Sequence, residues 1–214
     1  CKGAVVSPTL EHTPRGSALL AELGRRGITV ERVDDRELVT LAATEHPQGI
    51  VVAYQPREWT LDDCRVGAGR PLVVLGAVQE PGNVGTIART ALAFGEAGLV
   101  VLPGTVDLAN PKVVRAAAGA LFLLPHVHVE RAVLLDWLHR HGVALWATTM
   151  DGEPLQRDLP EATVALVLGN EGAGIDEELL AAAARQISIP IRAEAESLNV
   201  AVAAGILLHH LGTA

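Results

Sequence analysis

The stretch PLVVLGAVQEPGNVGTIARTALAFGEAGLVVLP, residues 71–103, decides the fold class of this chain. Its two ends, PLVVLGAV and GLVVLP, are apolar throughout and lack the alternation of a strand that has one face in water. The segment between them, NVGTIARTALAFG, has the composition of a helix that ends at Gly95. Two fully buried strands joined by a helix are typical of a parallel sheet.

The same alternation of strands and helices continues to the end of the chain. We expect helices at 111–119, 130–142 and 175–184, strands at 121–127, 143–149, 163–169 and 186–191, and a closing helix within ESLNVAVAAGILLHHL, residues 196–211. Apolar strands that alternate with helices predict an α/β fold, in which a parallel sheet has helices on both faces.

The first part of the chain has a smaller pattern of the same kind. A helix at 14–26, a strand at 28–33, a helix at 34–43 and a strand within HPQGIVVAY, residues 46–54, are expected, and the charged stretch 57–70 reads as a linker. We therefore expect a partial α/β domain with its linker at 1–66 and a larger domain at 67–214. The first residue is Cys, which indicates numbering that starts inside a longer protein.

Composition narrows the function classes. The net charge of −8 and the pI near 5.4 exclude a uniformly basic nucleic-acid binder, although local arginines can still hold phosphates. Three Trp, two Phe and one Tyr leave little material for stacking bases on aromatic rings. No apolar run is long enough for a membrane span, and two cysteines without a CxxC motif indicate a reducing compartment. A cytoplasmic protein without membrane contact is expected.

Three polar loops follow predicted strands: QEPGNVGT at 79–86 and GNEGAGID at 169–176, which contain glycines, and RAEAESLN at 192–199. Ligands of parallel sheets bind outside the carboxyl ends of the strands, so one shared site is expected at that edge. The first loop lacks the spacing of GxGxxG, and no phosphate-binding GK[ST] motif is present. A dinucleotide dehydrogenase or an NTPase is therefore disfavoured.

Each loop also has a purely structural interpretation. The glycines could simply permit positive φ in a turn, Ser197 and Asn199 could only cap the closing helix, and Arg89 could extend into solvent. Glu171 favours a ligand site, because it has no helix or strand face to occupy. Near the start of one helix, Asn83 and Arg89 can both point toward the carboxyl edge, where a guanidinium suits a phosphate.

Three segments together resemble a known family. QEPGNVGTIARTALAFG, LVLGNEGAGID and IPIRAEAESLNVAVAAGILL are similar, in order and spacing, to the three motifs of the SpoU (TrmH-type) RNA ribose 2′-O-methyltransferases of the SPOUT superfamily. This resemblance covers residues 71–211. HPQGIVVAY at 46–54, with the helix and strand before it, also resembles the end of the ribosomal-protein-like RNA-binding domain that many members carry.

The resemblance implies S-adenosylmethionine as cofactor, bound in a bent form at a C-terminal trefoil knot within a homodimer. It assigns cofactor binding, largely through backbone groups, to Thr148, Leu168, Gly169, Asn170, Glu171, Ile189, Ser197, Leu198 and Asn199. It assigns catalysis to Asn83, Arg89, Glu171, Ser197 and Asn199. No metal site is expected.

The implied reaction is methyl transfer to a ribose 2′-OH of RNA, with ribosomal RNA favoured over transfer RNA. Arg89 would bind a substrate phosphate and lower the proton affinity of the hydroxyl, with direct action as a base as the alternative, and Arg115 would add a phosphate contact. A tRNA ribose methyltransferase, a base methyltransferase and a non-catalytic RNA-binding module remain alternatives. The modified nucleotide, and the choice between housekeeping and antibiotic resistance, stay open.

Overall fold

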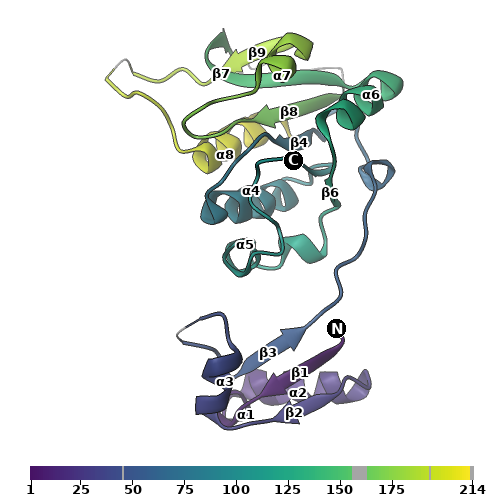
Figure 1. Ribbon diagram of the computed structural model, residues 1–214, viewed down its shortest axis with the longest axis vertical. Helices are drawn as coiled ribbons and strands as arrows, with labels where there is room; N and C mark the ends of the chain where they lie inside the picture. Colours follow the sequence, from purple (N-terminus) through teal and green to yellow (C-terminus); the bar gives the residue numbers. More distant parts are fainter. Residues whose placement is uncertain (45, 156–162, 193, 213–214) are drawn as a thin grey trace. The chain divides into compact units, whose positions relative to one another are not determined.

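The computed structural model describes residues 1–44, 46–155, 163–192 and 194–212. The chain forms two compact units, Cys1–Arg57 and Glu58–Ala214 (Figure 1).

The first unit is a three-stranded sheet with short helices. Its sheet has the order β2-β1-β3, in which β1 pairs parallel with β2 and antiparallel with β3. The elements are β1 (Gly3–Val6), α1 (Pro8–Glu11), α2 (Pro14–Arg25), β2 (Val30–Arg32), α3 (Asp35–Leu41) and β3 (Ile50–Ala53). The sequence predicted all of these except β1 and α1, because four residues are too few to display a recognisable period.

The second unit contains a six-stranded sheet with the order β6-β5-β4-β8-β7-β9, and every neighbouring pair is parallel. Its strands are β4 (Leu72–Leu75), β5 (Gly98–Val101), β6 (His126–His128), β7 (Ala144–Pro154), β8 (Val164–Leu168) and β9 (Arg185–Ser188). The predicted parallel α/β architecture is confirmed. The C-terminal knot implied by the resemblance stays a prediction.

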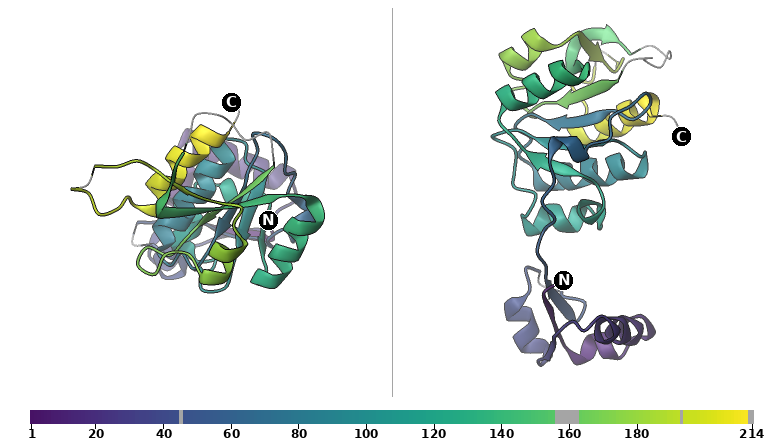
Figure 2. Two further views of the ribbon diagram at one scale, coloured as in Figure 1. Left: turned by 90° about the horizontal axis from the view of Figure 1, so that it is seen from above. Right: turned by 90° about the vertical axis from the view of Figure 1, so that its right-hand side faces the viewer.

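Helices cover both faces of this sheet (Figure 2, right). On one face lie α4 (Pro81–Ala93), α5 (Pro111–Ala116) and α8 (Val200–Leu211), and on the other α6 (Arg131–His141) and α7 (Glu177–Ala182). Leu72 and Val74 of β4 pack toward α6 and α7, while Val73 and Leu75 pack toward α4 and α8. Because all four side chains are fully buried, the strand must be apolar at every position.

None of the described helices is both long and apolar enough to span a bilayer. The twelve residues of α8 extend only about 18 Å.

The strand predicted at 121–127 is wrong over most of its length. Ala120–Phe122 form the 3₁₀ helix η2, Leu123 is exposed, and the strand β6 starts only at His126. Pro125 lacks an amide hydrogen, so it cannot contribute a donor to a longer ladder. The apolar composition of this segment reflects surface side chains as well as buried ones.

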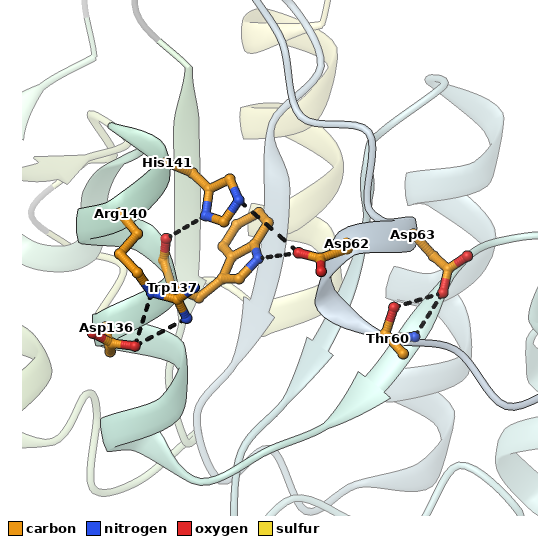
Figure 3. A network of polar contacts seen from close by, with 7 residues as sticks. All are labelled: Thr60, Asp62, Asp63, Asp136, Trp137, Arg140 and His141. Carbon is orange, nitrogen blue, oxygen red and sulfur yellow. Dashed lines mark hydrogen bonds and ion pairs between the residues drawn. The ribbon is translucent and has the colours of Figure 1, made fainter.

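The residues after Arg57, predicted to be a linker, pack with the second unit. They form the 3₁₀ helix η1 (Leu61–Asp63), whose leucine is buried against α6. The indole Nε1 of Trp137 donates a hydrogen bond of 2.8 Å to Asp62 Oδ1, and the His141 ring stacks on the indole at 4.3 Å between centroids (Figure 3). This network anchors η1 to α6.

Candidate functional site

The carboxyl ends of the strands meet at one edge of the sheet. Leu75 at the end of β4 lies opposite Leu168 at the end of β8, and Gly76 N donates to Leu168 O at 2.8 Å. On the other side of β8, Thr148 of β7 lies opposite Ile187 of β9. The loops that follow β4, β8 and β9 therefore start from the same edge, as the sequence predicted.

Hydrogen bonds join these three loops through Asn83, Glu171 and Asn199, which we call the Asn83 cluster. Asn83 Nδ2 donates to Glu171 Oε1 at 2.8 Å, and Asn199 Nδ2 donates to Asn83 Oδ1 at 2.9 Å. These residues are separated by 88 and 116 positions in the chain. The fold thus brings three of the predicted site residues into one polar network.

Helix starts hold two members of the cluster. Asn83 lies in the first turn of α4, which begins with Pro81 at a position where the missing amide hydrogen costs nothing. Asn199 caps α8, because its Oδ1 accepts from Ala201 N at 2.9 Å and Val202 N at 3.2 Å. Its Nδ2 remains to donate to Asn83, so Asn199 serves both as a cap and as a link between loops.

The third member, Glu171, is held out by a tight turn. Asn170 Nδ2 donates to Ala77 O at 2.9 Å, while its Oδ1 accepts from Gly172 N at 2.9 Å and Ala173 N at 2.8 Å. Asn170 therefore uses its side chain to build the turn rather than to contact a ligand. The turn leaves the exposed carboxylate of Glu171 beside Asn83.

Three of the residues predicted for catalysis or RNA binding lie outside the cluster. Arg89 is exposed and has no hydrogen bond or ion pair with any member of the Asn83 cluster. Six helical residues correspond to about 600°, which places Arg89 on a different face of α4 from Asn83. Arg115, in the last turn of α5, and Ser197, before α8, are also exposed. Their roles stay predictions.

The residues predicted to hold the cofactor offer mainly backbone groups. Thr148 Oγ1 donates to Val167 O at 2.8 Å, so that hydroxyl is already used by the neighbouring strand. The main-chain N–H groups of Ile189, Ser197 and Leu198 donate no hydrogen bond to another residue in the described ranges. Amides that no described residue engages fit the polar groups of a nucleoside-type cofactor.

A pocket of about 440 Å³ opens at the same edge, on the side of α6 and α7. Gln79, Asn170 and Asp176 line it together with Arg131 at the start of α6. Sequence reasoning missed Arg131 and Asp176, because each could be explained by its place in the first turn or at the cap of a helix. No local pattern predicts that they meet across 45 residues.

Known proteins provide an independent comparison. Residues 70–209 match the SpoU rRNA Methylase family, and residues 1–60 match the family described as RNA 2′-O ribose methyltransferase substrate binding. The chain is 37% identical, over 187 residues, to the 23S rRNA (guanosine(2553)-2′-O)-methyltransferase RlmP of Bacillus subtilis. The aligned region covers 86% of this chain and 73% of RlmP.

Solved structures agree with this match. AviRb, a SpoU methyltransferase from Streptomyces viridochromogenes crystallised with AdoMet, superimposes with a TM-score of 0.83 at 27% identity, covering 98% of this chain and 81% of AviRb. A solved structure described as giving insights into the 2-OH methylation of C/U34 on tRNA superimposes with a TM-score of 0.59 at 31% identity. This match covers 68% of this chain and 95% of the other chain. The chain therefore belongs to the SpoU rRNA methylase family.

Proposed function

We propose that this chain is an S-adenosylmethionine-dependent RNA methyltransferase that acts on a ribose 2′-OH of ribosomal RNA. The observation that carries this proposal is the Asn83 cluster, because it connects all three motif loops at the carboxyl edge of the sheet. The similarity to RlmP and to AviRb supports both the reaction and the cofactor.

Backbone groups of this chain would hold the cofactor. The amides of Ile189, Ser197 and Leu198, which donate to no described residue, suit its polar atoms, and Leu168 with Gly169 would form the wall at the end of β8. When bound, S-adenosylmethionine supplies an electrophilic methyl group on a sulfonium. The residues described next would orient the acceptor, and orientation is expected to provide most of the rate enhancement.

Glu171 would align the ribose. Asn83 holds its Oε1, while its Oε2 accepts no hydrogen bond from the described residues and can accept one from the 2′-OH. When the 2′-OH is methylated it would lose its proton, and the exposed carboxylate of Glu171 would pass that proton to solvent.

Arg89 would bind an RNA phosphate. Its guanidinium is exposed, which suits contact with a large substrate, and a guanidinium carries only N–H donors and no acceptor, which makes it a poor general base. A phosphate held there would fix the nucleotide relative to the Asn83 cluster. Arg115 would add a second contact to the RNA backbone.

Ribosomal RNA is favoured over transfer RNA by the extent of similarity. RlmP, which is named as a 23S rRNA methyltransferase, matches over 86% of this chain and therefore over parts of both compact units, whereas the tRNA-related structure covers 68%. Residues 1–66 would bind RNA and residues 67–214 would carry out methyl transfer. A first unit that recognises RNA explains how an acidic chain can select its substrate.

We further propose that the chain acts as a homodimer. Val202 and Ile206 are 52% and 44% exposed, and they lie one turn apart on the same side of α8. Burying these side chains against a second copy would stabilise the pair. Light scattering after gel filtration should give a dimer, and Ile206→Glu should give a monomer, whereas a wild-type monomer would contradict this part of the proposal.

Calorimetry and a transfer assay test the function together. The wild-type chain should bind S-adenosylmethionine and transfer labelled methyl groups to unmodified ribosomal RNA. Arg89→Ala should lose transfer by at least about 100-fold with cofactor affinity retained, since one charged contact to substrate is worth about 3 kcal/mol. A large loss of cofactor binding would overturn the role of Arg89, and the absence of cofactor binding by the wild type would overturn the function.

A further inference from the structure

The segment after α5 presents two large apolar side chains to solvent, and the function described above gives them no role. Phe122, in η2, is 53% exposed, and the adjacent Leu123 is 67% exposed. We propose that the Phe122 ring stacks on an unpaired base of single-stranded RNA next to the methylated nucleotide. This inference rests on the proposed function, because it names a part of the chain that would hold the RNA substrate outside the reaction site.

The turn η2 holds Phe122 in this exposed position. Ala120 and Leu121 are buried in the same apolar cluster as the side chains of α4. Phe122 N donates to Gly119 O at 3.1 Å, and Leu124 N donates to Ala120 O at 2.9 Å. Because Ala120 and Leu121 take the core side of the turn, a large part of the Phe122 ring remains in solvent.

Two arginines lie on the same part of the surface, where α4, α5 and η2 pack together (Figure 1). A Cβ at Gly85 of α4 would lie 2.5 Å from Ala116 Cβ and 2.8 Å from Ala117 N, so this side of α4 contacts the end of α5. Arg89 follows Gly85 by four residues, a rotation of only about 40°, and lies on the same side. Arg115 occupies the last turn of α5, directly before the turn that leads to η2.

This surface is basic in a chain that is acidic overall. The described elements that cover this face of the sheet, α4, α5, α8 and η2, contain Arg89, Lys112 and Arg115 but no Asp or Glu. All three cationic side chains are exposed. The helices α6 and α7 on the opposite face each contain acidic residues. We call Arg89, Lys112, Arg115 and Phe122 the Phe122 surface, and its charge suits a phosphate backbone.

An aromatic ring beside cations is the combination that binds single-stranded RNA. Lysines and arginines hold the backbone, and successive bases stack on exposed rings. The base must be unpaired, because bases within a duplex are already stacked on one another. The aromatic content of the chain excludes extensive stacking, but one ring is sufficient for one base. A twofold dimer through this surface would bring the cations of one copy toward those of the other, which disfavours a second copy as the occupant.

The stacked base would belong to a neighbour of the methylated nucleotide. Arg89 lies six residues after Asn83, about 9 Å along the axis of α4. A phosphate bound by Arg89 joins two nucleotides of the RNA. One of them can present its ribose to the Asn83 cluster while the other places its base on Phe122.

Two labelled oligomers test the stacking without knowledge of the RNA target. Fluorescein-labelled hexaadenylate and a labelled oligomer of six abasic ribose phosphates carry the same backbone charge, and fluorescence anisotropy measures the affinity of the full chain for each. The wild-type chain should bind hexaadenylate at least about fivefold more tightly than the abasic oligomer, because only hexaadenylate can stack.

Three variants locate the contact. Phe122→Leu keeps an apolar side chain but removes the ring, so the affinity for hexaadenylate should fall at least about fivefold while the affinity for the abasic oligomer stays unchanged. Phe122→Trp keeps a stacking ring and should retain the wild-type preference. The control Val133→Ala changes a side chain that is 50% exposed on α6, on the opposite face of the sheet, and should leave both affinities unchanged.

Salt dependence separates stacking from charge. Lys112→Gln should reduce the slope of log affinity against log salt concentration by about 0.7, the value for one phosphate contact to a single strand. Phe122→Leu should leave that slope unchanged, because stacking releases no counterions.

Equal affinities of the wild type for the two oligomers, or an unchanged preference in Phe122→Leu, would overturn the inference. A change of oligomeric state in Phe122→Leu, measured by light scattering, would assign this surface to a protein interface and would also overturn it. Calorimetry with S-adenosylmethionine separates the inference from the proposed function. Cofactor binding without a role for the ring rejects the stacking alone, whereas ring-dependent RNA binding in a chain that does not bind the cofactor supports the stacking and rejects methyl transfer.

Discussion

Replacing Glu96 by Gln should remove a specific pH dependence from the stability of the second unit. Glu96 follows α4 and is 3% exposed, and neither of its carboxyl oxygens has a hydrogen-bond partner in the described residues. Burial raises the pKa of this carboxyl from 4.5 to about 8, and the nearby charge of Arg70 opposes the rise only partly. Glu96 is therefore protonated in the folded protein at neutral pH.

The sign of the effect follows from proton linkage. The folded state keeps a proton that the unfolded state releases above pH 4.5, so the stabilisation is complete below pH 4.5 and is lost as the pH rises to about 8. If the whole pKa difference is converted into free energy at about 1.4 kcal/mol per pKa unit, the upper limit of the stabilisation is about 5 kcal/mol. Measurements between pH 5.5 and 8.5 sample only part of this interval, so we expect a loss of about 2 to 3 kcal/mol.

Urea unfolding followed by tryptophan fluorescence measures this loss. All three tryptophans, Trp59, Trp137 and Trp146, belong to the second unit, so their signal reports the unit that contains Glu96. The free energy of unfolding should fall more steeply with pH for the wild type than for Glu96→Gln. The exposed control Glu177→Gln should follow the wild type. Identical pH profiles for Glu96→Gln and the wild type would refute a buried, protonated carboxyl.

Three further substitutions test the packing and the site. Gly85→Ala should destabilise the second unit by about 1–3 kcal/mol in urea unfolding, because the new Cβ would lie 2.5 Å from Ala116 Cβ. In the control Gly82→Ala the new Cβ meets only a carboxylate at 3.4 Å, so this variant should be tolerated. Equal stabilities of the two variants would contradict the close packing of Gly85. Asn199→Asp should keep the helix cap and the stability but lose methyl transfer, since an aspartate cannot donate to Asn83. Asn199→Ala should also lower the stability by about 1 kcal/mol in a thermal melt, because it removes the cap. Unimpaired transfer by Asn199→Asp would argue against the Asn83 cluster. Asp62→Ala should lower the free energy of unfolding by about 1–2 kcal/mol, because it leaves the Trp137 indole unpaired. The surface control Asp136→Ala should lower it less. Similar chemical denaturation of the two variants would show that η1 is not anchored through Asp62.

Local sequence was sufficient where one period or one motif determined the structure. The β4 segment is apolar at each position because both faces are buried, and that pattern alone predicted a parallel sheet. The three loops could be predicted to meet, because parallel strands share one carboxyl edge. The hydrogen bonds between Asn83, Glu171 and Asn199 realise that expectation.

Local sequence was insufficient where contacts between distant residues decide the outcome. The segment 121–127 resembles a strand in composition, but only the surrounding packing shows that Phe122 and Leu123 are exposed. Proximity along α4 suggested that Arg89 accompanies Asn83, although the helical rotation separates them. The ion pair between Arg131 and Asp176 depends on two helices on the same face of the sheet, which no single motif encodes.

Identification of the methylated atom tests the central claim most directly. Ribosomal RNA incubated with the chain and labelled S-adenosylmethionine is digested with alkali, which cannot cleave beside a 2′-O-methylated ribose. The account predicts that the label is recovered in alkali-resistant dinucleotides, and that Asn83→Ala reduces this recovery by at least about tenfold, a loss of about 1.4 kcal/mol. Label recovered in mononucleotides as a methylated base, or full transfer by Asn83→Ala, would contradict it.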